Sequence, residues 1–266
     1  MRLSEEAMNM KYIVQSAVKK NSKEYKPMED FCICDAEKSI FIVTDGVTQS
    51  AEDYEQITAR SDAGMAAEIA ARTVHESLSH SDDPAQALTD GVRLAIERVG
   101  EYNKTAKASY PPATCLVAGC IRNDRLHFAY IGDSVIFLLR SSAKIQLAEQ
   151  QTEALATYRR VSGEKMTKRY LYDHVTNNIQ SPYGYGVILG DMRAMDFLHI
   201  ASIRLEPGDR VIISSDGLDS YLMFTPFDEI RSLSPEEMLP RSARYDEPPY
   251  AAFADDKSII IIDAEA

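Results

Sequence analysis

The chain has 266 residues, of which 45% are hydrophobic and 26% are charged, a composition typical of a globular protein. This length allows one large domain or two small ones, with enough residues to bury a substantial core. The formal net charge of -12 argues against non-specific binding to nucleic acid or to an anionic membrane surface. No apolar run approaches the roughly 18 residues of a membrane-spanning helix, and the N-terminal segment lacks the apolar core of a signal peptide.

The four cysteines, Cys32, Cys34, Cys115 and Cys120, all fall in apolar runs that resemble strands. Cys32 and Cys34 share one face of their strand and have no histidine nearby, which argues against a zinc site. We therefore expect free, buried thiols in a reducing compartment, and a cytoplasmic protein.

In the first half of the chain, strand patterns precede helix patterns. Alternating or continuous apolar residues predict strands over 10–17, 31–35 and 40–44. A stripe of apolar residues with helical spacing then predicts a helix over 61–79. Asp83 followed by Pro84 is typical of the start of a second helix, with aspartate as the N-cap and proline at the first helical position.

The second half of the chain returns to strands. Three consecutive patterns, over 113–121, 125–132 and 134–140, are spaced like hairpins, and residues 147–185 are too polar to assign. The remaining expected elements are strands over 185–189, 197–205, 210–214 and 257–263, and a short helix that begins at Ser234 and Pro235. Hairpins interrupted by a helix pair predict an α+β fold with mostly antiparallel sheets. Because no linker divides the chain, we expect a single domain over residues 1–266.

Two of the apolar runs end in Asp-Gly, at Asp45-Gly46 and at Asp216-Gly217. A strand that ends in this way delivers a carboxylate to the edge of a sheet, and the glycine allows a sharp turn and a close backbone approach. One such pair is usually only a turn, but two of them, together with acidic pairs elsewhere in the chain, indicate a functional site.

Two further acidic pairs lie at the starts of strands: Glu29-Asp30 and Asp255-Asp256. Carboxylates brought together from four distant places repel one another unless a cation neutralises them. Hard divalent ions such as Mg²⁺ and Mn²⁺ prefer oxygen ligands of this kind. The pattern indicates a two-metal hydrolase.

Five blocks in this order, MED, VTDG, ATCLVA with YIGDS, PGDRVIISSDGL and DDKSIII, resemble the metal-dependent Ser/Thr protein phosphatases of type 2C. The resemblance runs from about residue 29 to residue 263. It implies a four-layer α-β-β-α sandwich, in which two mostly antiparallel sheets are flanked by helix pairs. It also implies hydrolysis of phosphoserine and phosphothreonine in a phosphorylated protein substrate, with two Mn²⁺ or Mg²⁺ ions as cofactors.

The resemblance also implies roles for individual residues. Asp45 would bridge both ions, with Glu29 and the carbonyl group of Gly46 on one ion, and Asp216 and Asp255 on the other. Asp30 would hold a water bound to an ion. Catalysis would then depend on Asp45 and Asp216 through a metal-activated water, without a protein nucleophile.

Two departures from the family pattern concern catalysis. Val47 stands where the family often has histidine or methionine, and valine cannot protonate a leaving group, so a slower enzyme or a preference for acidic leaving groups is expected. The phosphate-binding arginine expected four residues before Glu29 is Tyr25. Lys23 or Lys26 could replace it, although lysine lacks the bidentate geometry of arginine.

A third departure concerns the family's optional third ion. Its ligands would be Asp133 and an aspartate at the position of Ser220, whereas the chain places Asp219 one residue earlier. Asp133 also suits a hairpin turn, so both roles remain open for it. Asp256 stands where the family usually has asparagine, and we expect it to be exposed rather than to bind an ion.

One basic cluster stands out in this acidic chain, and its members are Arg159, Arg160, Lys165, Lys168 and Arg169. A solvated flap accounts for such a cluster, but it could also steer a phosphorylated or acidic partner. Arg159 and Arg160 are therefore candidates for contact with substrate.

Two alternatives to a protein phosphatase remain. A non-catalytic pseudophosphatase that binds a partner would explain the missing acid at Val47 and the missing arginine at Tyr25. A phosphatase for small phosphoesters would share the same core. A haloacid-dehalogenase-like phosphatase is excluded, because its nucleophile would lie two residues before Asp45, where the chain has Val43.

Overall fold

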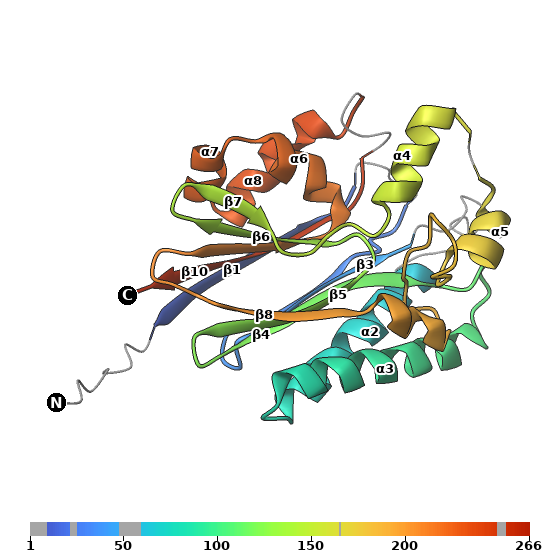
Figure 1. Ribbon diagram of the computed structural model, residues 1–266, viewed down its shortest axis with the longest axis horizontal. Helices are drawn as coiled ribbons and strands as arrows, with labels where there is room; N and C mark the ends of the chain where they lie inside the picture. Colours follow the sequence, from blue (N-terminus) through green and yellow to red (C-terminus); the bar gives the residue numbers. More distant parts are fainter. Residues whose placement is uncertain (1–9, 22–25, 48–59, 165, 249–253) are drawn as a thin grey trace.

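The computed structural model describes residues 10–21, 26–47, 60–164, 166–248 and 254–266 (Figure 1). The strands are β1 (Lys11–Lys19), β2 (Phe31–Asp35), β3 (Ile40–Gly46), β4 (Thr114–Arg122), β5 (Arg125–Ile131), β6 (Val135–Arg140), β7 (Ala143–Gln146), β8 (His199–Arg204), β9 (Arg210–Ser214) and β10 (Lys257–Glu265). They form two five-stranded sheets, with the orders β1-β10-β9-β6-β7 and β2-β3-β4-β5-β8. Every neighbouring pair is antiparallel, as the sequence predicts.

The helices are α2 (Asp62–Ser79), α3 (Pro84–Asn103), α4 (Glu153–Ser162), α5 (Lys168–Tyr170), α6 (Asp219–Phe224), α7 (Phe227–Ser232) and α8 (Pro235–Ser242). Figure 1 shows α2 and α3 on the outer face of one sheet, and α6, α7 and α8 on the outer face of the other. This four-layer α-β-β-α arrangement confirms the expected fold class. Among the described residues, no helix is both long and apolar enough to cross a bilayer.

Alternation along β3 shows how one strand serves two cores. Phe41 and Val43 pack between the two sheets, whereas Ile40 and Ile42 pack under α2 and α3. All four side chains are fully buried, because successive side chains of a strand point to opposite faces and both faces of this sheet are covered. A third hydrophobic core lies between the sheet that contains β6, β9 and β10 and the helices α6, α7 and α8.

Side-chain caps fix where the long helices begin. The hydroxyl group of Ser61 accepts a hydrogen bond from the backbone N–H of Gly64 at 3.0 Å, and Asp83 accepts from Ala85 and Gln86 at 3.1 Å. Each cap satisfies donors that the first helical turn leaves unpaired. The expected start of the second helix at Pro84 is therefore confirmed.

The expected strand over 185–189 is wrong. That segment makes only isolated bridges, between Thr114 and Ile188 and between Thr176 and Tyr185. The buried side chain of Asn177 takes the place of a neighbouring strand, because its amide group accepts from the N–H of Val187 at 2.8 Å and donates to the carbonyl of Val187 at 3.0 Å. The sequence pattern does not predict strand β7 or helices α4, α5, α6 and α7.

Strand pairing brings the acidic motifs to one end of the sandwich. Phe31 pairs with Thr44, so the start of β2 lies beside the end of β3. Ser214 pairs with Ile259 and with Val135, so the end of β9 lies beside the starts of β10 and β6. The acidic residues before β2 and β10, at the end of β3 and after β9 therefore meet at the same end.

Candidate metal centre

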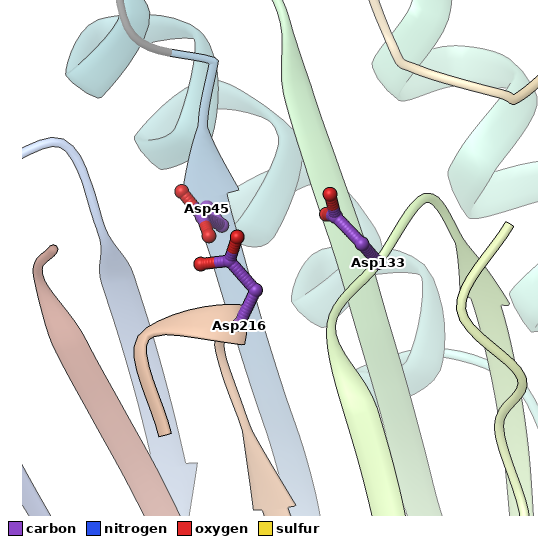
Figure 2. Close-up of side chains that lie close together, drawn as sticks. All are labelled: Asp45, Asp133 and Asp216. Carbon is purple, nitrogen blue, oxygen red and sulfur yellow. The ribbon is translucent and has the colours of Figure 1, made fainter. Parts of the chain in front are cut away.

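Three aspartates from different segments lie together at this end of the sandwich (Figure 2). Asp45 is the penultimate residue of β3, and Asp133 lies in the turn between β5 and β6. Asp216 lies two residues after the end of β9. One carboxylate oxygen from each lies within 4.8 Å of the others. The sequence predicts that Asp45 and Asp216 meet, and the structure adds Asp133, which was a candidate only for a third ion.

The glycines of both Asp-Gly motifs are needed for close backbone packing. A Cβ atom on Gly46 would lie 2.8 Å from the carbonyl oxygen of Ala63 and 2.9 Å from that of Glu29. A Cβ atom on Gly217 would lie 2.0 Å from the carbonyl oxygen of Asp256. Each glycine thus lets its strand end lie against the backbone of one of the other acidic pairs, which explains why aspartate is followed by glycine in both places.

The side chain of Glu29 is positioned by the residue that caps helix α2. Its side chain is buried, and its Oε1 atom accepts a hydrogen bond from the Ser61 hydroxyl group at 2.9 Å. Because Ser61 also caps α2, the position of this carboxylate is tied to the start of that helix. Asp30 is also buried, directly before β2.

Asp256 is buried, with 1% of its surface exposed, so the expectation that it is exposed is wrong. Its Oδ1 atom accepts hydrogen bonds from the backbone N–H of Asn21 at 2.8 Å and from the Asn21 side chain at 2.7 Å. Its Oδ2 atom accepts from the backbone N–H of Glu29 at 2.7 Å. These donors come from segments more than 200 residues away along the chain, so they compensate for the burial in a way that local sequence cannot reveal.

Burial and mutual repulsion shift the acidic residues in the same direction. Burial raises the pKa of Asp45 well above its usual value, and the charges of Asp30 and Asp216 raise it further. Burial, followed by the charges of Asp133 and Asp255, likewise raises the pKa of Asp216. For Asp30, burial and the charge of Asp256 raise the pKa to about 7. A cation among these groups would relieve the repulsion that causes the shifts.

The donor set fits a hard divalent ion. The Oδ1 atom of Asp216 is buried and forms no hydrogen bond within the described part of the chain. A buried carboxylate oxygen is rarely left in this state unless another partner occupies the site. Three carboxylates converge there and the neighbouring ligand candidates also offer oxygen, as Mg²⁺ and Mn²⁺ prefer.

A pocket of about 370 Å³ opens onto this cluster. Asp45, Asp133, Asp216 and Asp255 line its acidic part. Its remaining lining is largely apolar and comes from Val47, Cys115, Leu155, Ala156, Leu171 and Val187, together with Gly46, Thr152, Arg159 and Tyr185. The pocket therefore offers a carboxylate floor and an apolar wall, with Arg159 as the one basic side chain among these lining residues.

The structure places the residues predicted to contact substrate in different locations. Arg159 lines the pocket from α4, whereas Arg160 donates a hydrogen bond to the hydroxyl group of Thr157 at 3.2 Å and is absent from the described lining. The ammonium group of Lys26 instead forms ion pairs with the carboxylates of Asp255 and Glu29. Lys23 and Tyr25 lie outside the described residues.

Some site residues were not singled out from the sequence. Ser61 supports Glu29, and its signal was present, because a serine before a helical stripe is a typical N-cap. Cys115 lines the pocket from the start of β4, and burial followed by the charges of Asp133 and Asp45 raises the pKa of its thiol. All four cysteines are free.

The chain matches the family profile described as protein phosphatase 2C over residues 19–247. It belongs to this family of metal-dependent Ser/Thr protein phosphatases. No curated protein sequence matches it.

Solved structures share the fold at low sequence identity. The Ser/Thr phosphatase PstP/Ppp of Mycobacterium tuberculosis is 18% identical, with a TM-score of 0.66, and the match covers 96% of this chain and 99% of that one. The PstP catalytic domain in complex with two manganese ions is 16% identical, with a TM-score of 0.66 and the same coverage. PppA of Pseudomonas aeruginosa is 17% identical, with a TM-score of 0.67 over 95% of this chain and 97% of that one.

Proposed function

We propose that this chain hydrolyses phosphoserine and phosphothreonine in proteins with the help of two Mn²⁺ or Mg²⁺ ions. The observation that carries the proposal is the meeting of Asp45, Asp133 and Asp216 at the open end of a type 2C phosphatase fold. The PstP catalytic domain, which has the same fold, binds two manganese ions, and this supports manganese as the metal. We assign the whole of residues 1–266 to one catalytic domain.

For the two ions we propose the ligands Glu29, Asp45, Asp216, Asp255 and the carbonyl group of Gly46, with Asp30 holding a water at the edge of the site. Asp255 lines the same pocket as Asp45 and Asp216, which supports its place in this set. Asp133 is the candidate ligand for a third ion, because its carboxylate already lies beside those of Asp45 and Asp216.

When bound, a pair of divalent ions supplies an activated water as the nucleophile and neutralises the phosphoryl oxygens. The chain's own contribution is the arrangement around that chemistry. The carboxylates of Asp45 and Asp216 hold the divalent cations at the pocket. Arg159, which lines the same pocket from helix α4, attracts the phosphoryl group. Apolar side chains such as Val47, Leu155 and Val187 limit the access of bulk water and strengthen these electrostatic interactions.

Protonation of the leaving group is the weak point of this site. Val47 packs against Ala113, Cys115 and Val187 and has no proton to give. The serine or threonine alkoxide of a peptide must then take its proton from solvent. General acid catalysis typically contributes roughly 10²–10⁴-fold, so we expect slow turnover of phosphopeptides and faster turnover of aryl phosphates, whose leaving groups are more acidic.

A non-catalytic binding module is the second candidate function. Lys26 already neutralises part of the acidic cluster through Asp255 and Glu29, and Val47 removes the general acid. A protein that binds Mn²⁺ but cleaves no phosphoester would support this alternative. The pocket volume also suits small phosphoesters, so protein and small-molecule substrates must be compared directly.

As partners we propose phosphorylated proteins, and neither nucleic acid nor membrane, because the net charge of -12 opposes polyanionic surfaces. The four free cysteines support a reducing, cytoplasmic location.

The test is hydrolysis of a phosphothreonine peptide and of p-nitrophenyl phosphate with Mn²⁺, with EDTA, and with Asp216→Asn. The proposal requires turnover that depends on Mn²⁺ and is lost with both the chelator and the substitution. Asp90→Asn is the matched control, because Asp90 is an exposed residue of α3 that is absent from the pocket lining, and it should retain full turnover. Folded wild-type protein without any turnover would contradict the enzymatic function.

A further inference from the structure

A buried lysine lies inside the acidic end of the sandwich. Lys26 has 4% of its surface exposed. Its ammonium group donates a hydrogen bond to Oδ1 of Asp255 at 2.5 Å and lies 3.3 Å from Oε2 of Glu29. Both partners belong to the proposed metal ligands, so a cation of the chain itself already contacts the carboxylates that an ion would use.

The positions of these two carboxylates do not depend on Lys26 alone. Ser61 holds Oε1 of Glu29 at 2.9 Å, and the backbone N–H of Asp256 donates to Oδ1 of Asp255 at 2.9 Å. The backbone of Glu29 is fixed separately by Asp256. Loss of the lysine charge would therefore leave the ligand geometry largely in place and change mainly the electrostatic potential.

The charge of Lys26 acts in two opposite ways. Without metal, it offsets the repulsion among Glu29, Asp255 and Asp256, which would otherwise oppose folding. With metal, it lies close to a divalent ion of the same sign, and interactions between charges this close are only weakly screened at a buried site. The same side chain thus stabilises the metal-free protein and weakens its hold on metal.

We propose that Lys26 is a built-in counter-cation that lowers the affinity of the site for divalent metal while it keeps the metal-free carboxylates together. This inference rests on the proposed function, because it takes Glu29 and Asp255 as metal ligands. It assigns Lys26 a role in metal affinity rather than the direct contact with phosphate that the sequence left open. The site then fills only at higher metal concentration than its carboxylate count alone would require.

The test compares variants of Lys26 by calorimetric titration with Mn²⁺ at fixed ionic strength. Lys26→Gln removes the charge but keeps a hydrogen-bond donor for Asp255, so it should bind Mn²⁺ at least tenfold more tightly than wild type. Lys26→Arg keeps the charge and should bind like wild type. Lys144→Gln is the control for loss of a lysine charge elsewhere, because Lys144 on β7 is partly buried and donates hydrogen bonds to the backbone carbonyls of Leu222 and Met223 rather than to a carboxylate, so its affinity for Mn²⁺ should change less than twofold.

A second measurement is used if Lys26→Gln is too unstable to be purified without metal. Protein purified with Mn²⁺ is titrated with a metal chelator, and Lys26→Gln should need about tenfold more chelator than wild type to lose half its metal. In EDTA, Lys26→Gln should also unfold at a lower temperature than wild type, and Mn²⁺ should close that gap.

Unchanged or weaker Mn²⁺ binding by Lys26→Gln would overturn the counter-cation role, as would equally tight binding by Lys26→Arg. Failure of the proposed function is recognised separately, because the wild-type protein itself would then bind no Mn²⁺.

Discussion

The Oδ2 atom of Asp256 accepts a hydrogen bond from the backbone N–H of Glu29 at 2.7 Å. This bond joins the acidic pair before β2 to the acidic pair before β10, and so joins one sheet of the sandwich to the other at the end where the ligand candidates meet. Asp256 thus acts through the backbone of Glu29, as a residue that positions a candidate ligand.

Substitution of Asp256 should reveal this positioning role. Asp256→Ala leaves the buried N–H groups of Asn21 and Glu29 without their acceptor, and we expect the free energy of unfolding to fall by about 3 kcal/mol. Asp256→Asn keeps one acceptor oxygen and removes one charge from an acidic cluster, but its NH2 group then faces the N–H that the lost oxygen accepted, so its loss should be smaller, about 1–2 kcal/mol. Urea unfolding in EDTA measures both, and equal losses for the two variants would contradict the hydrogen-bonding role.

Introduction of a general acid at position 47 should increase turnover of phosphopeptides. Val47 lines the pocket beside Asp45, so Val47→His places an imidazole where a leaving group can take its proton. We expect kcat for a phosphothreonine peptide to rise about tenfold, below the roughly 10²–10⁴-fold of an optimised acid. Turnover of p-nitrophenyl phosphate should change little, because its leaving group needs no proton. Val47→Phe controls for size, and an equal gain with phenylalanine would argue against acid catalysis.

Arg159 and Arg160 are neighbours in sequence with different expected roles. Arg159 lines the pocket, so Arg159→Ala should raise KM for a phosphopeptide about tenfold through loss of a charged contact with phosphate. Arg160→Ala should change KM less than twofold, because that side chain bonds to Thr157 on its own helix. Steady-state kinetics of the two variants decide the matter. Similar effects would mean that the basic cluster acts through its overall charge.

Stability of the metal-free protein should fall as pH rises. Burial and the charge of Asp256 raise the pKa of Asp30 to about 7, from an ordinary value of 3.8. A carboxyl group whose folded pKa is raised stabilises the fold fully below about pH 4, and this contribution is lost as pH rises through 7. The pKa values of Asp45 and Asp216 are raised as well, so they act in the same direction.

Thermal unfolding in EDTA between pH 5 and pH 8 measures this dependence. The midpoint temperature of wild type should decrease across the interval, and Asp30→Asn should flatten the slope because it removes one of the titrating groups. Mn²⁺ should reverse the loss at pH 8, where the carboxylates are ionised. A midpoint that rises with pH in EDTA would contradict the inferred repulsion.

The elements around the site could largely be predicted from local sequence. β-Branched runs such as 40–44 and 210–214 bury both faces, so their strand signal is strong, and each Asp-Gly motif marks the strand end where its glycine packs closely. The polar segment over 147–185 gave no such signal. Helix α4 buries only Leu155, so its pattern is too weak to separate from a loop.

Other features arise only from contacts between distant segments. A lysine and an aspartate are usually exposed, so the sequence gives no reason to bury Lys26 and Asp256. Their burial is possible because Asp255, Glu29 and Asn21 meet them from segments far away along the chain. The place of Arg159 at the pocket likewise depends on how α4 packs over the sheet ends.

The most direct measurement is a crystal structure of the wild-type protein grown with Mn²⁺, with anomalous scattering recorded to locate manganese. We expect two anomalous peaks at this end of the sandwich, one in contact with the carboxylates of Asp45 and Asp216 and the other in contact with those of Asp45 and Glu29. A well-ordered crystal at saturating Mn²⁺ with no anomalous peak in contact with Asp45 or Asp216 would contradict this expectation.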